Sequence, residues 1–235
     1  MIIPNKDYKC EPVWIYKYRG LLIALATLAI LVYARPSLFS LCIGLVFSAA
    51  GELLRLWALG WTGEHTRKQS LETPLLVVGG PYKFIRNPLY LGNILTSLGV
   101  ITAASGRLTW PGTLGMFIFG LSALYFVYAS CIISEEAFLA VKFGNVFFDY
   151  RGSTPALIPR WRDLAEALNA WGGDGGRVSD RKAHFVFKED ELESEPQPAA
   201  AADPHFQRAN LKFEISSLIW LAVIWSYLAV SVFCR

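Results

Sequence analysis

The stretch from Gly79 to Gly92 gathers residue types that could bind a polar ligand at the entrance of an apolar segment. Its first three residues, two glycines and a proline, predict a shaped turn, because glycine permits and proline fixes unusual backbone angles. Asn87 suits the N-cap of a helix that begins at Pro88, so Asn87 and Tyr90 lie in the first turn. Unpaired N–H groups there favour a carboxylate or another polar ligand. A belt of aromatic and basic side chains at a membrane boundary is an equally compatible interpretation.

A second candidate group is Glu135-Glu136, two adjacent carboxylates at the end of another apolar segment. Adjacent carboxylates repel one another, so cations or hydrogen-bond donors are expected close by. Aromatic residues and prolines follow between residues 143 and 159. Taken alone, this pair is also compatible with an ordinary solvated helix face.

Glu52 and Arg55 are charged residues inside an apolar segment, spaced so that they share one helix face and can pair. A structural ion pair and a role for Arg55 in binding an acidic or phosphate headgroup both remain open. His65 is expected to be a polar loop residue rather than a catalytic base. The scattered cysteines and histidines lack the spacing of a metal site, so none is predicted.

Composition places these residues in a membrane protein. The chain has 235 residues, of which 54% are hydrophobic and 17% are charged, more apolar surface than a soluble domain of this size hides. Five apolar segments predict an all-α, polytopic fold with five transmembrane helices: 18–34, 38–57, 89–104, 110–133 and 213–233.

The distribution of basic residues predicts the orientation. With a cytoplasmic N-terminus and an external C-terminus, 18 of the 22 lysines and arginines fall on the inside. This rule accounts for the net charge of +3, so no nucleic-acid partner is expected. The hairpin formed by segments 89–104 and 110–133 brings the two candidate groups to the same cytoplasmic face.

Three regions are predicted along the chain. Residues 1–160 form a transmembrane core whose cytoplasmic motifs cover 63–92 and 135–159. Residues 161–210 are rich in glycine, charge, proline and alanine, which predicts a flexible cytoplasmic insertion. Residues 211–235 form the fifth span.

The order of these motifs is specific enough to indicate a family. A Gly-Pro-Tyr turn, an Arg-x-Pro-x-Tyr-x-Gly helix start, a hydrophobic hairpin, Glu-Glu, and an aromatic tail ending in Pro-x-x-Ile-Pro resemble the isoprenylcysteine carboxyl methyltransferases and the related phospholipid N-methyltransferases. The similarity covers roughly residues 45–160. It implies an integral membrane enzyme that binds S-adenosylmethionine on its cytoplasmic side and methylates a membrane lipid or lipidated acceptor. No obligate protein partner is evident from the sequence. The cofactor contacts that it implies are Arg67, Pro74, Leu75, Leu76, Val77, Tyr82, Asn87, Pro88, Leu89, Tyr90 and Glu135.

Two positions depart from the family pattern. Asn87 stands where the family usually has histidine, and asparagine cannot take up a proton at neutral pH. Cys131 stands where the eukaryotic carboxyl methyltransferases have an arginine that assists the substrate. A prenylcysteine carboxylate is therefore a less secure substrate than the resemblance alone implies.

The candidate catalytic residues are Arg55, Arg86, Tyr90 and Glu136. A carboxylate acceptor needs no base, whereas an amine must lose a proton, for which Glu136 or Glu52 is the nearest candidate. A sterol-type reductase that uses NADPH is the alternative enzyme, although Arg67, Lys68 and Lys83 form a sparse cluster for a 2′-phosphate. A non-catalytic membrane scaffold is the third hypothesis.

Overall fold

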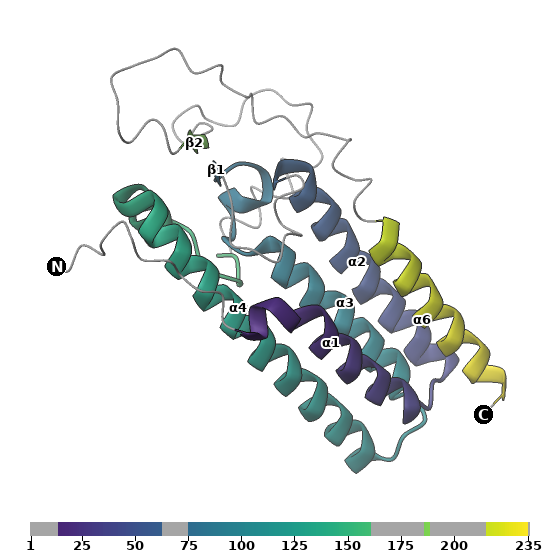
Figure 1. Cartoon of the computed structure of the whole chain (residues 1–235). Helices are drawn as coiled ribbons and strands as arrows, with labels where there is room; N and C mark the ends of the chain where they lie inside the picture. Colours follow the sequence, from purple (N-terminus) through teal and green to yellow (C-terminus); the bar gives the residue numbers. More distant parts are fainter. Residues whose placement is uncertain (1–13, 63–74, 161–185, 189–214, 235) are drawn as a thin grey trace, which may run out of the picture.

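The computed structural model describes residues 14–62, 75–160, 186–188 and 215–234, which form a bundle of long helices (Figure 1). Short elements sit at one end of this bundle, called the inner end below. They are the strands β1 (Leu75–Val77) and β2 (Val186–Lys188) and the single turn η2 (Gly80–Lys83). The helices are α1 (Trp14–Val32), α2 (Leu38–Thr62), α3 (Pro88–Ala104), α4 (Trp110–Ser153) and α6 (Ile215–Cys234).

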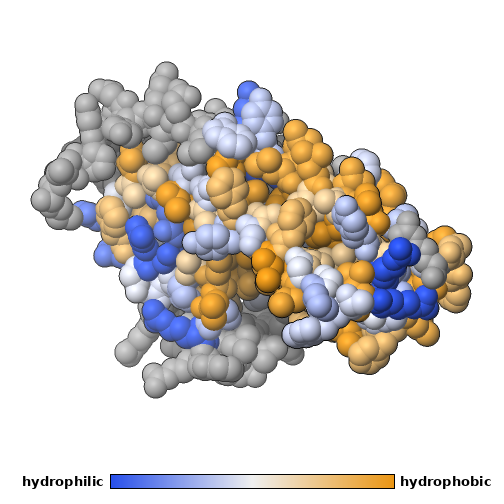
Figure 2. Space-filling model, turned by 90° about the horizontal axis from the view of Figure 1, so that it is seen from below, coloured by the Kyte–Doolittle hydropathy of each residue, from blue (hydrophilic) through white to orange (hydrophobic). Residues whose placement is uncertain are grey.

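Each predicted apolar segment coincides largely with a helix among the described residues, so the helical, polytopic membrane fold is confirmed. Within the described ranges, α1, α2, α4 and α6 are long and apolar enough to cross a membrane. Helix α3 is apolar but has only 17 residues, so the count of five spans stays a prediction. Apolar side chains dominate the face shown in Figure 2, and hydrophilic residues gather mostly toward its two ends. An exposed apolar surface of this extent is typical of a protein surrounded by lipid.

Helices α2 and α3 pack through small residues that let their backbones approach closely. A Cβ added at Gly44 would lie 2.4 Å from the Gly99 carbonyl oxygen, and one at Gly51 would lie 2.5 Å from that of Gly92. Between these contacts, the Ser48 hydroxyl donates to the Thr96 carbonyl at 3.1 Å. Small residues spaced one turn apart are how membrane helices associate without a hydrophobic driving force. This contact fixes the position of α3, and of Tyr90 in its first turn, along the axis of α2.

Helix α4 is much longer than the predicted span of 110–133, because the chain continues as helix to Ser153. The continuation is interrupted at Gly144, whose φ of 52° and ψ of −127° are not helical. Glycine adopts positive φ without a Cβ penalty, so it redirects the last part of α4. Beyond it, Phe147 packs with Phe143 and Leu76 in a small apolar cluster at the inner end.

A small antiparallel sheet adds a minor exception to the all-α prediction. Leu75 pairs with Lys188 and Val77 with Val186. Strand β2 is the part of the predicted flexible insertion 161–210 that the structure describes, and it pairs with a segment of the predicted cofactor site. The rest of that insertion lies outside the described residues.

Candidate active site

The two candidate groups predicted from the sequence meet at the inner end of α3 and α4. The Tyr90 hydroxyl donates to Glu135 Oε1 at 2.8 Å, although the residues are 45 positions apart. Tyr90 is buried, and its ring centroid lies 5.3 Å from that of Tyr128. The pair therefore presents a carboxylate beside two aromatic rings, an arrangement that suits a cation.

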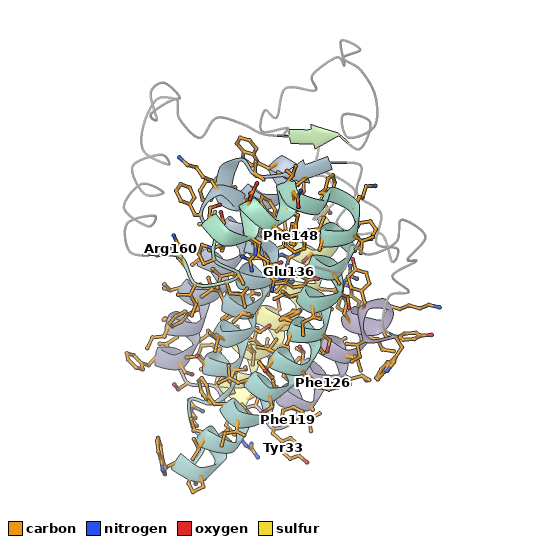
Figure 3. All side chains as sticks on the ribbon, turned by 90° about the vertical axis from the view of Figure 1, so that its left-hand side faces the viewer. Tyr33, Phe119, Phe126, Glu136, Phe148 and Arg160 are labelled. Atoms are coloured by element: carbon orange, nitrogen blue, oxygen red, sulfur yellow. The ribbon has the colours of Figure 1, made fainter. Side chains whose placement is uncertain are left out.

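The Glu136 carboxylate binds different partners from those of Glu135. Its Oε1 accepts from Arg86 Nη2 at 2.9 Å and from Arg86 Nε at 3.1 Å, while its Oε2 lies 3.5 Å from Arg151 Nε. Figure 3 shows Glu136 and Phe148 toward the inner end of the bundle, with Phe119 and Phe126 toward the opposite end. The adjacent carboxylates are thus separated by their partners, and the cations and donors expected around them are present.

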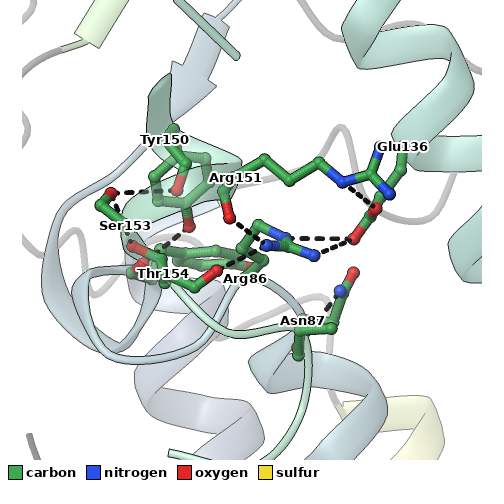
Figure 4. A network of polar contacts seen from close by, with 9 residues as sticks. Arg86, Asn87, Glu136, Tyr150, Arg151, Ser153 and Thr154 are labelled. Carbon is green, nitrogen blue, oxygen red and sulfur yellow. Dashed lines mark hydrogen bonds and ion pairs between the residues drawn. The ribbon is translucent and has the colours of Figure 1, made fainter. Parts of the chain in front are cut away.

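Arg86 and Asn87 also bind the segment that follows α4 (Figure 4). Arg86 Nη1 donates to the carbonyls of Arg151 and Thr154, and its backbone N–H donates to the Pro155 carbonyl at 2.9 Å. Asn87 uses both its backbone N–H, at 3.1 Å, and its side-chain Nδ2, at 3.2 Å, to reach the Ala156 carbonyl. The start of α3 is therefore fastened to the chain that leaves α4.

The predicted capping role of the Asn87 side chain is wrong. Asn87 does hold the N-cap position before Pro88, but its side chain makes no capping hydrogen bond. The amide is instead directed to the Ala156 carbonyl, which also accepts from the Asn87 backbone N–H, because the segment after α4 passes close by. The start of the helix was therefore predicted correctly, whereas the hydrogen-bond partner of the Asn87 side chain was not.

The glycine turn before α3 is shaped as predicted. Gly80 has a φ of 57°, and a Cβ added at Gly79 or Gly80 would lie within 2.4 Å of the Trp61 ring. The next residues place Tyr82 in the core, where its carbonyl accepts a hydrogen bond of 2.6 Å from the Tyr150 hydroxyl. Burial raises the pKa of the Tyr82 hydroxyl, so this side chain is neutral across the physiological range.

The remaining predicted cofactor contacts are only partly described. Leu75, Leu76 and Val77 form β1, and the Leu76 side chain is buried in the apolar cluster with Phe143. Pro88 is buried and Leu89 half-buried in the first turn of α3. Arg67 and Pro74 lie outside the described residues.

Helix α1 contributes two residues that the sequence reasoning missed. Tyr16 is buried close to Glu135. The Arg19 guanidinium stacks 4.1 Å above the Tyr16 ring and lies within electrostatic reach of Glu135 and Cys131. The sequence predicted only an interfacial anchor for Trp14, Tyr16 and Tyr18. The spacing of about one helix turn between Tyr16 and Arg19 was the available signal, but nothing local indicated packing against α4.

Arg55 and Glu52 form the ion pair that their spacing predicted, with Nη1 and Oε1 3.1 Å apart. Arg55 Nη1 also donates to Ser217 Oγ of α6 at 3.1 Å, and Thr96 Oγ1 donates to Glu52 Oε1 at 3.2 Å. The pair thus lies among α2, α3 and α6, near Tyr128. Arg86 and Glu136 instead pair with each other, with Nη2 and Oε1 2.9 Å apart.

Comparison with characterised proteins gives three partial matches. The chain is 34% identical over 107 residues to methanethiol S-methyltransferase 2 of Bradyrhizobium diazoefficiens, covering 46% of this chain and 36% of that protein. It is 27% identical over 117 residues to the protein-S-isoprenylcysteine O-methyltransferase of Schizosaccharomyces pombe, covering 48% and 47%. It is also 36% identical over 85 residues to a cobalt-zinc-cadmium resistance protein of Cupriavidus metallidurans, covering 36% of each.

This chain therefore spans between about a third and a half of the length of these relatives. No family model matches it, and neither does any solved structure. Fold and site define an integral membrane protein with a polar centre at one end of its helices. The matches confirm the resemblance to membrane methyltransferases of the isoprenylcysteine type.

Proposed function

We propose that this chain is a methyltransferase that uses S-adenosylmethionine to methylate an acceptor held in the membrane. The observation that carries the proposal is the hydrogen bond of 2.8 Å between Tyr90 and Glu135, which joins the two motifs at the inner end of the bundle. The partial similarity to an S-methyltransferase and an O-methyltransferase supports the same reaction class.

The residues around Glu135 fit the charges of this cofactor, which supplies an activated methyl group when bound. The Glu135 carboxylate suits its ammonium group, and the Arg19 guanidinium suits its carboxylate. The rings of Tyr16 and Tyr90 suit a sulfonium cation, because aromatic faces attract positive charge. Arg67, Tyr82 and the segments 74–77 and 87–89 complete the proposed cofactor site.

Arg86 and Glu136 take a positioning role in this proposal. Their contacts, which include the carbonyls of Arg151 and Thr154, hold the start of α3 against the end of α4. They keep Tyr90 and Glu135 at hydrogen-bonding distance, and precise placement is a major part of catalysis in a methyl transfer that needs no covalent intermediate with the protein. Tyr90 is then the catalytic candidate of this group, because it borders the cofactor.

The site faces the cytoplasm if α3 is counted as a span, which brings the total to five. A helix of 17 residues is about 25 Å long, close to one hydrocarbon thickness of about 30 Å. With five spans, the lysine and arginine distribution sets the N-terminus inside and the C-terminus outside. The Gly79–Gly92 and Glu135–Pro159 motifs then share the cytoplasmic face.

The acceptor is proposed as a lipid or a lipidated molecule that reaches the site from the bilayer. Two of the relatives are named for different acceptors, methanethiol in one and isoprenylcysteine in the other. Cys131, which occupies the place of the family arginine, is buried on α4, and Arg19 from α1 lies within electrostatic reach of it. Arg19 is therefore our candidate for the missing positive charge.

Labelled methyl transfer tests this proposal. Purified protein in lipid vesicles is incubated with S-adenosylmethionine that carries a labelled methyl group, and lipid-soluble label is counted. We expect label in the lipid fraction with the natural protein and loss of most of it with Tyr90→Phe or Arg19→Gln. Equal incorporation by the natural protein and by both variants would contradict the proposal, as would no incorporation into lipid extracts of any composition.

A further inference from the structure

The helices α1, α2, α3, α4 and α6 line a cavity of about 530 Å³ that is open on one side. This volume lies within the range of small-molecule sites, about 300–1,000 Å³. Most of the wall is aliphatic, with side chains from at least four helices, including Ile23, Leu31, Val100, Ile101, Leu124 and Ile224. A long hydrocarbon chain is the natural occupant of such a wall within a membrane.

The polar lining of this cavity gathers toward its inner end. Apart from Thr27 of α1, the hydroxyl, amide and charged side chains come from α2, α3 and α6: Glu52, Arg55, Asn93, Thr96, Ser97 and Ser217. Tyr128 also lines the cavity, and its ring lies 5.3 Å from that of Tyr90. The polar end of the cavity is thus one aromatic ring away from the candidate active site.

An acceptor, the carboxylate of Glu52, is part of the hydrogen-bonding capacity left at this end. The Glu52 side chain is only 9% exposed, and its Oε2 is buried without a hydrogen-bond partner among the residues that the structure describes. Its other oxygen is already used by Arg55 and Thr96. A buried carboxylate oxygen without a donor is costly, so a ligand that brings a donor is favoured there.

The charge at this end disfavours an anion. The guanidinium of Arg55 is 3.1 Å from Glu52 and also donates to Ser217, so its charge is already balanced. An anionic headgroup would face Glu52 Oε2 at close range and low dielectric, where like charges repel strongly. This argues against the acidic or phosphate headgroup considered for Arg55 from the sequence.

The cavity also has a side that faces the lipid. Leu28 of α1 and Trp220 of α6 line it and are 58% and 68% exposed. Further toward the outer end, the Tyr227 hydroxyl of α6 reaches the Leu31 carbonyl of α1 at 3.3 Å and closes the gap between these helices. A ligand can therefore enter from the lipid between α1 and α6, on the side of this contact that is nearer to the inner end.

We propose that this cavity binds a single-chain amphiphile whose headgroup is a hydrogen-bond donor, an amine or a hydroxyl, with the headgroup at Glu52 Oε2 and the chain along the aliphatic wall. The proposal goes beyond the proposed function, because this binding needs neither a cofactor nor methyl transfer. The sequence left both Glu136 and Glu52 as the carboxylate nearest to an amine acceptor. This proposal places the donor headgroup at Glu52.

Binding is measured with three probes of equal chain length: dodecylamine, dodecanol and dodecanoate. The full chain is reconstituted in lipid nanodiscs, and each probe is titrated while the thermal unfolding midpoint is followed, since a ligand of the folded state raises it with concentration. We expect the amine and the alcohol to bind at least about 10-fold more tightly than the carboxylate, the scale of one hydrogen bond to a charged group.

Two matched variants test the location. Ala123→Phe fills the cavity from α4, whereas Ala50→Phe makes the same change on the exposed, lipid-facing side of α2. Ala123→Phe should abolish the shift caused by dodecylamine, and Ala50→Phe should preserve it, which also corrects for partition of the probes into the lipid. Glu52→Gln should reduce the preference for dodecylamine over dodecanoate about 10-fold.

The probe series remains decisive if Glu52→Gln does not fold, because the natural protein alone reports the headgroup preference. Dodecanoate binding as tightly as dodecylamine would overturn the headgroup assignment. An equal dodecylamine shift in the natural protein and in Ala123→Phe would overturn the location. Neither result bears on labelled methyl transfer, so failure here is distinguishable from failure of the proposed function.

Discussion

Glu135 and Glu136 show how two identical neighbours acquire different roles from their surroundings. Glu135 accepts from a tyrosine hydroxyl beside aromatic rings, whereas Glu136 is held by two arginines. The sequence could predict that cations and donors surround the pair. It could not predict which carboxylate takes which partner, because that depends on how α3 and the end of α4 pack against each other.

The first prediction separates these two carboxylates. Glu135→Gln removes the charge proposed to hold the cofactor ammonium, so S-adenosylhomocysteine should bind more weakly by about 1.5–3 kcal/mol. Glu136→Gln weakens the contact with Arg86 and should lower the free energy of unfolding by about 1–3 kcal/mol with a smaller effect on affinity. Calorimetric titration and thermal unfolding of both variants provide the check. Unchanged affinity in Glu135→Gln would remove this residue from the site.

The second prediction concerns Asn87, whose side chain reaches Ala156 instead of capping α3. Asn87→Asp keeps a good capping residue but replaces the donor with a carboxylate that faces a carbonyl. It should therefore destabilise the protein more than Asn87→Ala, which should cost about 0.5–1.5 kcal/mol. Asn87→His should be tolerated, because an imidazole N–H can also donate. Thermal unfolding of the three variants decides, and a stable Asn87→Asp protein would restore the capping role.

At the scale of the elements, the apolar segments were predictable because the length of each run of hydrophobic residues can be counted in the sequence. Their ends were not all predictable. Helix α4 runs 20 residues past its predicted end, through Gly144, because the chain beyond the predicted span folds onto β1 and η2 rather than into loop. The contribution of α1 to the site, through Tyr16 and Arg19, likewise depends on tertiary packing.

The third prediction tests the contact between α2 and α3. Gly51→Val places a side chain against the backbone of Gly92, so it should force the helices apart and cost about 1–3 kcal/mol or more. Gly115→Val is the matched control, because a Cβ at Gly115 meets nothing within 4 Å. Unfolding in mixed detergent micelles measures both. Equal stability of the two variants would show that this contact is not as tight as described.

At the scale of the whole molecule, the sequence predicted a helical membrane protein and the meeting of its two motifs. Both followed from simple physics, because apolar segments must cross the bilayer and a hairpin returns the chain to the face it left. The cavity and its polar end could not be predicted. They arise where five helices fail to fill the space between them, which no pattern along a single segment reveals.

The fourth prediction addresses orientation. Segment 161–210 should be cytoplasmic, because it lies among the basic stretches that the distribution of lysine and arginine assigns to the inside. Protease added to inside-out vesicles should cleave within this segment, while right-side-out vesicles should protect it. The reverse pattern would contradict the five-span orientation and would move the candidate site to the outer face.

The most direct test of the central claim is cofactor binding by the purified natural protein. S-adenosylhomocysteine and NADPH are each titrated while thermal unfolding is followed, with Glu135→Gln as the control for the site. S-adenosylhomocysteine should raise the unfolding midpoint of the natural protein, the rise should shrink in Glu135→Gln, and NADPH should have no effect. Stabilisation by NADPH alone would indicate a reductase, and stabilisation by neither would indicate a scaffold. Either result would contradict a methyltransferase site built on Tyr90 and Glu135.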